Sequence, residues 1–145
     1  MDVVRRPRAR WFRVGPVVLV GLAAVLSACG EGTAAGGADL EGRTFVSTGV
    51  AGHELVPGSE VQVIFQSDRI SVQAGCNTLN GGATWEGDVL VVAQPMARTM
   101  MACDDDLSRQ DDWLEALLTS EPALSLDGST LVIGDSAEGL TLEEQ

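Results

Sequence analysis

The segment that most constrains this chain lies near its start and decides how much of the chain is left to fold. Five arginines precede an apolar run at residues 14–25, and Leu-Ser-Ala-Cys follows at residues 26–29. The run has 12 residues, whereas a membrane-spanning helix needs roughly 20. A positive start, a short apolar run and small residues before a cut site are typical of a signal peptide. We therefore predict that residues 1–28 are a signal peptide that is removed.

The cysteine at the end of this segment, Cys29, supports a more specific prediction. Leu-Ser-Ala-Cys resembles the lipobox of bacterial lipoproteins, in which cleavage falls before a cysteine whose thiol carries lipid. An ordinary signal with a chance cysteine, or an uncleaved anchor, are the alternatives. Two acyl chains anchor a protein stably, whereas one holds it only marginally. Lipidated bacterial cysteines usually carry two or three chains. We expect Cys29 to fix the protein to the extracytoplasmic face of the cell membrane.

The rest of the chain divides into a tether and one domain. Residues 29–39 are rich in glycine and alanine and contain no side chain large enough to pack. Such segments behave as flexible tethers. Residues 40–145 remain for folding, which suits a single domain with one modest core.

The charge of the exported chain excludes one class of partner. After removal of residues 1–28, four basic and 20 acidic residues remain, a formal net charge of −16. Nucleic-acid binding needs basic patches that neutralise phosphates, so no nucleic-acid partner is expected. An anionic membrane surface would also repel this charge, which leaves membrane attachment to the lipid on Cys29. Solubility explains the acidity better than binding of a ligand by acidic groups does.

Alternating apolar residues predict an antiparallel sheet. At residues 60–66 the side chains of Val61, Val63 and Phe65 share one face, the pattern of a half-buried strand. A Ser-Asp turn and a second alternating run at residues 69–73 complete a hairpin. An Asp-Gly pair at residues 127–128 is a strong hairpin signal. Further strands are expected at residues 44–48, 83–85, 89–92, 123–126, 130–133 and 140–142.

One segment, residues 108–119, has helical spacing instead. Its apolar residues share one face: Trp113, Leu114, Leu117 and Leu118. Its polar residues are assigned to the opposite face: Arg109, Gln110, Asp112 and Glu115. Ser108 and Asp111 resemble a capping box, and three aspartates just ahead suit a helix N-terminus. The apolar face must cover the sheet. The fold class is therefore α+β, a mainly antiparallel, barrel-like sheet with one helix packed across it.

Two cysteines, Cys76 and Cys103, lie inside the predicted domain. Outside the cytoplasm an even pair favours a disulfide. Their separation is 27 residues, and closing a loop of that size stabilises a domain by roughly 3.5 kcal/mol on chain-entropy reasoning. Two separate buried thiols are the alternative.

The residues around these cysteines also carry a family resemblance. Gly-Cys-Asn at residues 75–77 is followed by Asn-Gly-Gly at 80–82 and by Met-Ala-Arg-Thr-Met-Met-Ala-Cys at 96–103. This series resembles the signature of the META/HslJ family, and Leu40, Gly42 and Phe45 resemble the family's opening strand. Tryptophan is usual where this chain has Phe45. The resemblance covers essentially residues 40–145.

The resemblance implies a compact antiparallel domain with one helix, in an envelope or secreted protein that is often a lipoprotein. The family's bacterial namesake is linked to heat shock, which implies a stress-related role. The family has no established catalytic residues, so none is transferred. Only Cys76 and Cys103 carry over, as structural positions.

No constellation of reactive residues indicates an enzyme. His53 is the single histidine, and neither the partners of a metal-binding histidine nor the motif of a triad nucleophile accompanies it. Cys76 and Cys103 lack the close Cys-x-x-Cys spacing of redox catalysts. We predict an exposed His53, no catalytic residue and no cofactor.

Other candidate residues have simpler structural interpretations. The aspartates at positions 104–106, 111 and 112 could offer oxygens to calcium, but the EF-hand pattern is missing, so a charged helix start is favoured and no metal site is predicted. The methionines at 96, 100 and 101 could form a copper patch, but core packing is favoured. Asn77 and Asn80 are predicted to flank tight turns.

These features together predict a lipid-anchored envelope protein with a non-catalytic, stress-related or interaction module. Its surface would bind an envelope protein or a small ligand. Two alternatives remain open: an envelope hydrolase with paired carboxylates in one cleft, and a module that binds divalent cations at the acidic helix start.

Overall fold

The computed structural model describes residues 40–85 and 87–145. The predicted signal peptide at residues 1–28, Cys29 and the predicted tether at residues 29–39 lie outside these residues. No helix in the described part is long and apolar enough to cross a membrane. The elements in chain order are β1 (Thr44–Ala51), β2 (Gln62–Gln66), β3 (Arg69–Gln73), β4 (Thr78–Thr84), β5 (Val91–Val92), β6 (Ala97–Arg98), α2 (Asp105–Thr119), β7 (Leu124–Asp127), β8 (Thr130–Gly134) and β9 (Gly139–Glu144).

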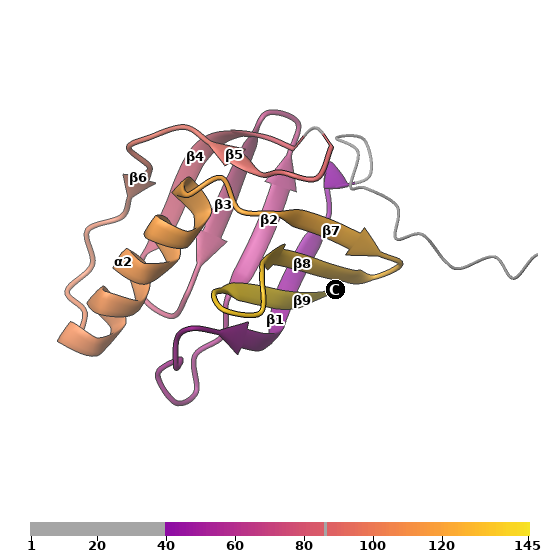
Figure 1. Ribbon diagram of the computed structural model, residues 1–145. Coiled ribbons are helices and arrows are strands. Elements are labelled where there is room, and N and C mark those ends of the chain that lie inside the picture. The colour runs from indigo at the N-terminus through magenta and orange to yellow at the C-terminus, as the bar shows by residue number, and fades with distance from the viewer. Residues whose placement is uncertain (1–39, 86) are drawn as a thin grey trace, which may run out of the picture. The chain divides into compact units, whose positions relative to one another are not determined.

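The strands form one curled antiparallel sheet. Their order is β5-β4-β3-β2-β1-β9-β8-β7, and β6 pairs with β4 (Figure 1). The two ends of this order approach each other, because Val89 bridges to Ala123 just before β5 and β7. The Leu90 N–H donates to the Pro122 carbonyl at 3.0 Å, and the Leu124 N–H donates to the Asp88 carbonyl at 2.8 Å. The prediction of a barrel-like antiparallel sheet is confirmed.

The predicted alternation places the expected side chains in the core. Val61, Val63 and Phe65 are fully buried, and the β2–β3 hairpin closes through the pair Gln66–Arg69. The Phe65 ring meets Phe45 edge-on at 5.9 Å and Trp85 edge-on at 5.1 Å between ring centroids. Such edge-to-face pairs stabilise a core beyond their buried area.

The C-terminal hairpins also follow the prediction. Strand β7 pairs with β8 from Leu124 to Asp127, and Asp127 faces Thr130 across a two-residue turn. Gly128 occupies the first turn position with φ 61°. Tight hairpin turns require this left-handed backbone, which glycine adopts without steric cost.

Strand β4 is longer than the alternation suggested, and one prediction about it is wrong. Asn80 lies in the middle of β4, paired with Ser71 of β3 and Ala97 of β6, and does not flank a turn. The glycine after it serves close packing. A Cβ added to Gly81 would lie 3.0 Å from Cγ1 of Val92, so a side chain there would push β5 away from β4.

Helix α2 begins three residues earlier than predicted. Asp104 is its N-cap residue, without a side-chain capping bond, and Asp105 and Asp106 fill the first turn. Ser108 is already helical, since its N–H donates to the Asp104 carbonyl at 3.0 Å. The proposed capping box of Ser108 and Asp111 is therefore wrong. Acidic residues near the N-terminal end of the helix dipole favour the earlier start.

The buried face of α2 includes two polar residues that were assigned elsewhere. Its buried residues are Gln110, Asp111, Leu114, Leu117 and Leu118. Gln110 is fully buried, so its predicted place on the polar face is wrong. The helix thus covers the sheet with an apolar stripe whose N-terminal end is polar.

Candidate functional site

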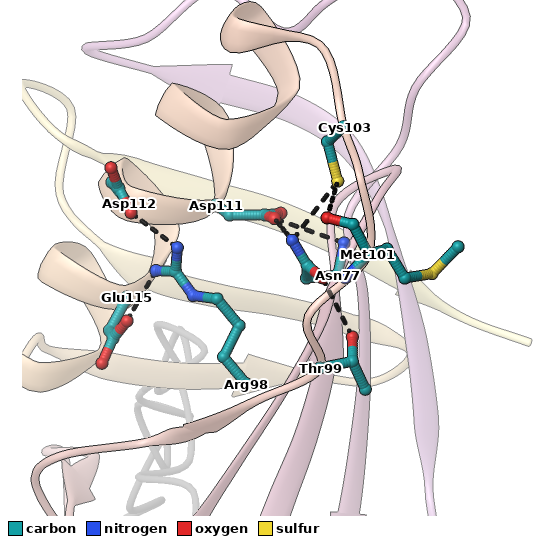
Figure 2. Close-up of polar contacts among 8 residues, drawn as sticks. All are labelled: Asn77, Arg98, Thr99, Met101, Cys103, Asp111, Asp112 and Glu115. Carbon is teal, nitrogen blue, oxygen red and sulfur yellow. Dashed lines mark hydrogen bonds and ion pairs between the residues drawn. The ribbon is translucent and has the colours of Figure 1, made fainter.

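The family-like motifs meet where the first turns of α2 approach the turn between β3 and β4 (Figure 2). This approach depends on Gly75, which has φ 109°. A Cβ added there would lie 3.0 Å from Cβ of Ser59 and 3.2 Å from Cδ2 of Leu107. Only glycine combines this backbone conformation with so close a contact.

Asn77 is the centre of the polar cluster. Its Nδ2 donates to Oδ2 of Asp111 at 2.9 Å and to Sγ of Cys103 at 3.3 Å. Its Oδ1 accepts from the Thr99 hydroxyl at 3.1 Å and from the Met101 N–H at 3.0 Å. A side-chain amide offers two donors and two acceptor positions. All four are therefore used inside the protein.

A disulfide joins Cys76 to Cys103 beside this amide, with the two Cα atoms 6.2 Å apart. The bridge predicted from the cysteine pair is present. It connects the β3–β4 turn to the segment at residues 99–103, which we call the Met loop. The Thr99 N–H also donates to the Thr78 carbonyl at 3.1 Å. The Met loop is thus held at its start, its middle and its end.

Asp111 brings a buried carboxylate to the same place. Besides the Asn77 amide, its Oδ2 accepts the Asn77 backbone N–H at 3.2 Å. Its Oδ1 is buried and has no hydrogen-bond partner among the described residues. A buried carboxylate needs donors to offset its lost hydration. Asn77 supplies those donors.

Gln110 holds a second loop against α2. Its Oε1 accepts the Val56 N–H at 2.6 Å. Its Nε2 donates to the Ser59 hydroxyl at 2.8 Å and to the Ala74 carbonyl. The adjacent polar residues of α2 therefore fasten the helix to residues 56–59 and to the end of the β3–β4 hairpin.

On the exposed side of α2, Arg98 of β6 bridges two acids. Its guanidinium lies 2.6 Å from Oδ1 of Asp112 and 2.7 Å from Oε2 of Glu115. The hydrogen bond that Arg98 donates to Asp112 is the main reason that the pKa of Arg98 is raised. Partial burial acts in the opposite direction, and the bond donated to Glu115 raises the pKa further. This clamp ties the short strand β6 to the helix.

His53 is not the exposed loop residue that was predicted. Its ring stacks on Trp113 of α2, with centroids 4.3 Å apart and planes 9° from parallel, and the residue is half-buried. A depression of about 320 Å³ lies beside this stack, between residues 53–57 and the side chains of Asp106 and Arg109. Glu54 and Asp106 both line it.

The structure does not gather the five candidate calcium-binding aspartates. Asp111 binds Asn77, Asp112 binds Arg98, and Asp106 pairs with Arg109. Residues 40–85 and 87–145 contain no group of three His, Cys, Asp or Glu side chains placed to hold a metal ion.

The three methionines also separate. Met96 is buried at 6% exposure, whereas Met100 is 93% and Met101 is 64% exposed. Core packing is confirmed for Met96 and is wrong for the pair on the Met loop. Asn77, the disulfide and strand β4 hold the backbone of this loop against the domain. The side chains of Met100 and Met101 are exposed to solvent.

The family-like motifs singled out Asn77 and the cysteines, but the buried positions of Gln110 and Asp111 were not predicted. A signal for both was present. They lie four and three residues before Leu114, and these are the spacings of a single helix face. Their polar character hid their position on the buried stripe.

The fold and this cluster define a class of protein: a small antiparallel half-barrel covered by one helix, with a disulfide-bridged polar cluster at their junction. The profile of the META domain family matches residues 38–145, so the chain belongs to that family. None of the curated proteins matches the sequence significantly.

Two structures determined by NMR are similar in fold. One has a TM-score of 0.60 and 21% identity, covering 75% of this chain and 94% of the other. The second, a protein from Burkholderia xenovorans, has a TM-score of 0.61 and 14% identity, covering 99% of each chain. At these identities the likeness concerns the fold alone.

Proposed function

We propose that this protein is a lipid-anchored envelope protein whose META domain acts without catalysis, as an interaction module in a stress response. Lipid on Cys29 holds it at the extracytoplasmic face of the cell membrane, and residues 29–39 serve as a tether. The partner is another envelope protein. The observation that carries this proposal concerns the most connected polar residue of the site, Asn77. All four hydrogen-bonding positions of its amide serve internal contacts.

The Met loop supports binding of a protein rather than a small molecule. Its main chain is fixed by the Asn77 cluster, and it presents two exposed thioether side chains, Met100 and Met101. Methionine adapts to irregular partner surfaces, and exposed apolar side chains that lie together mark interaction sites. A projecting loop suits a protein surface, whereas small molecules bind in concave sites.

The hydrolase alternative would have to use the depression beside His53, because Glu54 and Asp106 both line it. Its support is weaker. Carboxyl groups that act as general acids lie in shielded, apolar surroundings. The Asp106 side chain is 71% exposed and is paired with Arg109.

Site-specific photo-cross-linking in intact cells tests the interaction. A photoreactive residue replaces Met100 in one full-length chain and Ser136, exposed on the β8–β9 loop, in the other. We expect one envelope protein to be captured from position 100 and not from position 136. Adding Met101→Asp should abolish that capture. Equal capture from both positions, or capture that survives Met101→Asp, contradicts the proposal.

The anchor is tested separately by metabolic labelling with a fatty acid. Wild-type protein should incorporate the label and sediment with membranes, whereas Cys29→Ser should do neither. Lack of label in the wild-type protein would refute the anchor and leave the interaction experiment standing.

A further inference from the structure

The Met loop carries a second, independent inference, which concerns chemistry at the sulfur atoms and does not depend on any partner. Met100 is 93% exposed and Met101 is 64% exposed, whereas Met96, on the same segment of chain, is 6% exposed. Oxidation of methionine follows the exposure of its sulfur. The described part of the chain thus contains two accessible thioethers and one protected one.

The contacts that hold the Met loop do not involve these sulfurs. Thr99 bonds to Thr78 through its N–H and accepts the Thr78 N–H at 3.0 Å on its hydroxyl. Met101 is held through its backbone N–H. Figure 2 shows the Met101 side chain pointing away from the cluster around Asn77. A change at either sulfur leaves the described contacts of the loop intact.

The position of Met96 is the opposite case. Its Cγ and Cε atoms lie within 3.4 Å of the place where a Cβ on Gly81 would stand. The side chain therefore fills the space above β4. An oxygen added to this sulfur would become a polar group buried without a partner, which destabilises an apolar core.

No thiol among the described residues competes for oxidant, because Cys76 and Cys103 are already joined. The thioethers are therefore the sulfur groups that remain to be oxidised. We propose that Met100 and Met101 form a reversible oxidation site that takes up peroxide at the surface of the domain, without loss of the fold.

The reaction is balanced with peroxide as the oxidant. A lone pair on the methionine sulfur attacks one peroxide oxygen, the O–O bond breaks, and an S–O bond forms. The second oxygen leaves as hydroxide, takes up the proton carried by the transferred oxygen and becomes water. The sulfur loses two electrons and the peroxide gains them. Methionine sulfoxide reductases reverse this change with two electrons from a thiol reductant, and the sulfoxide oxygen leaves as water.

Peptide mass mapping of the full-length protein after timed exposure to hydrogen peroxide tests the site. We expect one added oxygen on each of Met100 and Met101, at rates roughly tenfold or more above that of Met96 because exposure controls the reaction. In urea, Met96 should react as fast as the other two. After modification at Met100 and Met101, the urea midpoint should stay unchanged, and a sulfoxide reductase should restore the original mass.

Equal rates at Met96, Met100 and Met101 in the folded protein would overturn the proposal, and so would a clearly lowered urea midpoint after oxidation of the loop. The double variant Met100→Leu/Met101→Leu is the matched control. It should keep the wild-type urea midpoint, and its peptide that contains residues 100 and 101 should take up no oxygen at the dose that saturates the wild-type loop. The measurement uses isolated protein, so its outcome is independent of the interaction proposed above.

Discussion

Asp111, in the second turn of helix α2, accepts two hydrogen bonds from Asn77: one from the backbone N–H at 3.2 Å and one from the side-chain amide at 2.9 Å. The same amide holds Thr99 and Met101 of the Met loop. One residue pair therefore links the helix, the β3–β4 turn and the Met loop. Because the pair is buried, losing either partner leaves polar groups without hydrogen bonds.

Replacement of Asn77 should destabilise the whole domain. Asn77→Ala removes the side-chain donor to Asp111 and the acceptor of the Met101 N–H, and leaves only the backbone N–H of residue 77 on the Asp111 carboxylate. We expect the free energy of unfolding to fall by about 3 kcal/mol, since each unsatisfied buried group costs about 1–3 kcal/mol. Urea unfolding followed by tryptophan fluorescence measures the change. Asn80→Ala, on the neighbouring strand, is the control and should cost less than about 1 kcal/mol.

Coupling between Asn77 and Asp111 gives a second prediction. In a double-mutant cycle with Asn77→Ala and Asp111→Ala, the double variant should be more stable than the sum of the single changes predicts, by about 1–3 kcal/mol. The reason is that Asn77→Ala has already removed the side-chain hydrogen bond that Asp111→Ala would otherwise break. Strictly additive effects would show that the two residues stabilise the domain independently.

The disulfide between Cys76 and Cys103 should contribute about as much to the free energy of unfolding as Asn77 does. Its loop spans 27 residues, for which chain entropy predicts about 3.5 kcal/mol. Reducing agent should therefore lower the urea midpoint of the wild-type protein. The variant Cys76→Ala/Cys103→Ala should start from the lower midpoint and show no response to reductant. A response in that variant would mean that the reductant acts elsewhere.

Most strands and the turns after β2 and β7 could be predicted because their information is local, whereas β6 and the first part of β4 were not predicted. Val61, Val63 and Phe65 alternate in sequence, and the same period places them on one face of β2. Cys76 and Asn77 could be singled out because they belong to short motifs with fixed spacing.

The remaining features depend on contacts between distant segments. The segment with His53 has no hydrophobic period, so its stacking on Trp113 has no local signal. Asn80 precedes two glycines, which locally indicate a turn, but close packing of β5 on β4 explains Gly81. For Gln110, the spacing of the helix face was correct and residue polarity was misleading.

Gln110 provides a pH-dependent prediction. In Gln110→Glu, the buried carboxylate still accepts the Val56 N–H but loses the donors to Ser59 and Ala74. Burial favours the neutral acid, so the pKa of the new Glu is higher in the folded protein than its unfolded value of about 4.3. The folded state then binds more protons, and the deficit against wild type grows as the pH rises above that unfolded value.

Unfolding of this variant in urea at pH 4 and pH 7 checks the sign. We expect a deficit of about 2–4 kcal/mol at pH 7 that is smaller at pH 4. Gln110→Met has similar length and no titratable group, so its deficit should be the same at both pH values. If Gln110→Glu instead lost more unfolding free energy at pH 4 than at pH 7, the burial of this side chain would be contradicted.

Asp135 should show the opposite dependence. Its Oδ1 accepts the N–H groups of Glu138 at 3.0 Å and Ala137 at 2.7 Å, and these bonds lower the pKa of Asp135 below its ordinary value of 3.8. Its contribution to stability is present above pH 3.8 and is lost as the pH falls through the lower folded value.

An NMR titration of the Asp135 carboxyl carbon should give a midpoint below 3.8. Asp135→Asn keeps an oxygen acceptor without the titrating charge. As the pH falls below 4, its free energy of unfolding should therefore decrease less than that of the wild-type protein. Glu138→Gln removes a charge from the same loop without removing an acceptor of backbone N–H groups. It should retain the wild-type acid response.

The end of helix α2 offers a substitution that should stabilise the protein. Glu121, one residue beyond the C-cap Ser120, has φ 57° and is the one non-glycine residue with positive φ in the described part of the chain. Helices commonly end on glycine at this position, because a side chain makes the left-handed conformation unfavourable. Glu121→Gly should therefore raise the free energy of unfolding by about 0.5–1 kcal/mol, after the added flexibility of the unfolded chain is deducted.

Asparagine tolerates this conformation better than most residues, so Glu121→Asn should gain less, and Glu121→Ala should gain nothing. This order, measured by urea unfolding, separates relief of the backbone from loss of the Glu121 charge, because all three variants remove the charge and only two relieve the backbone.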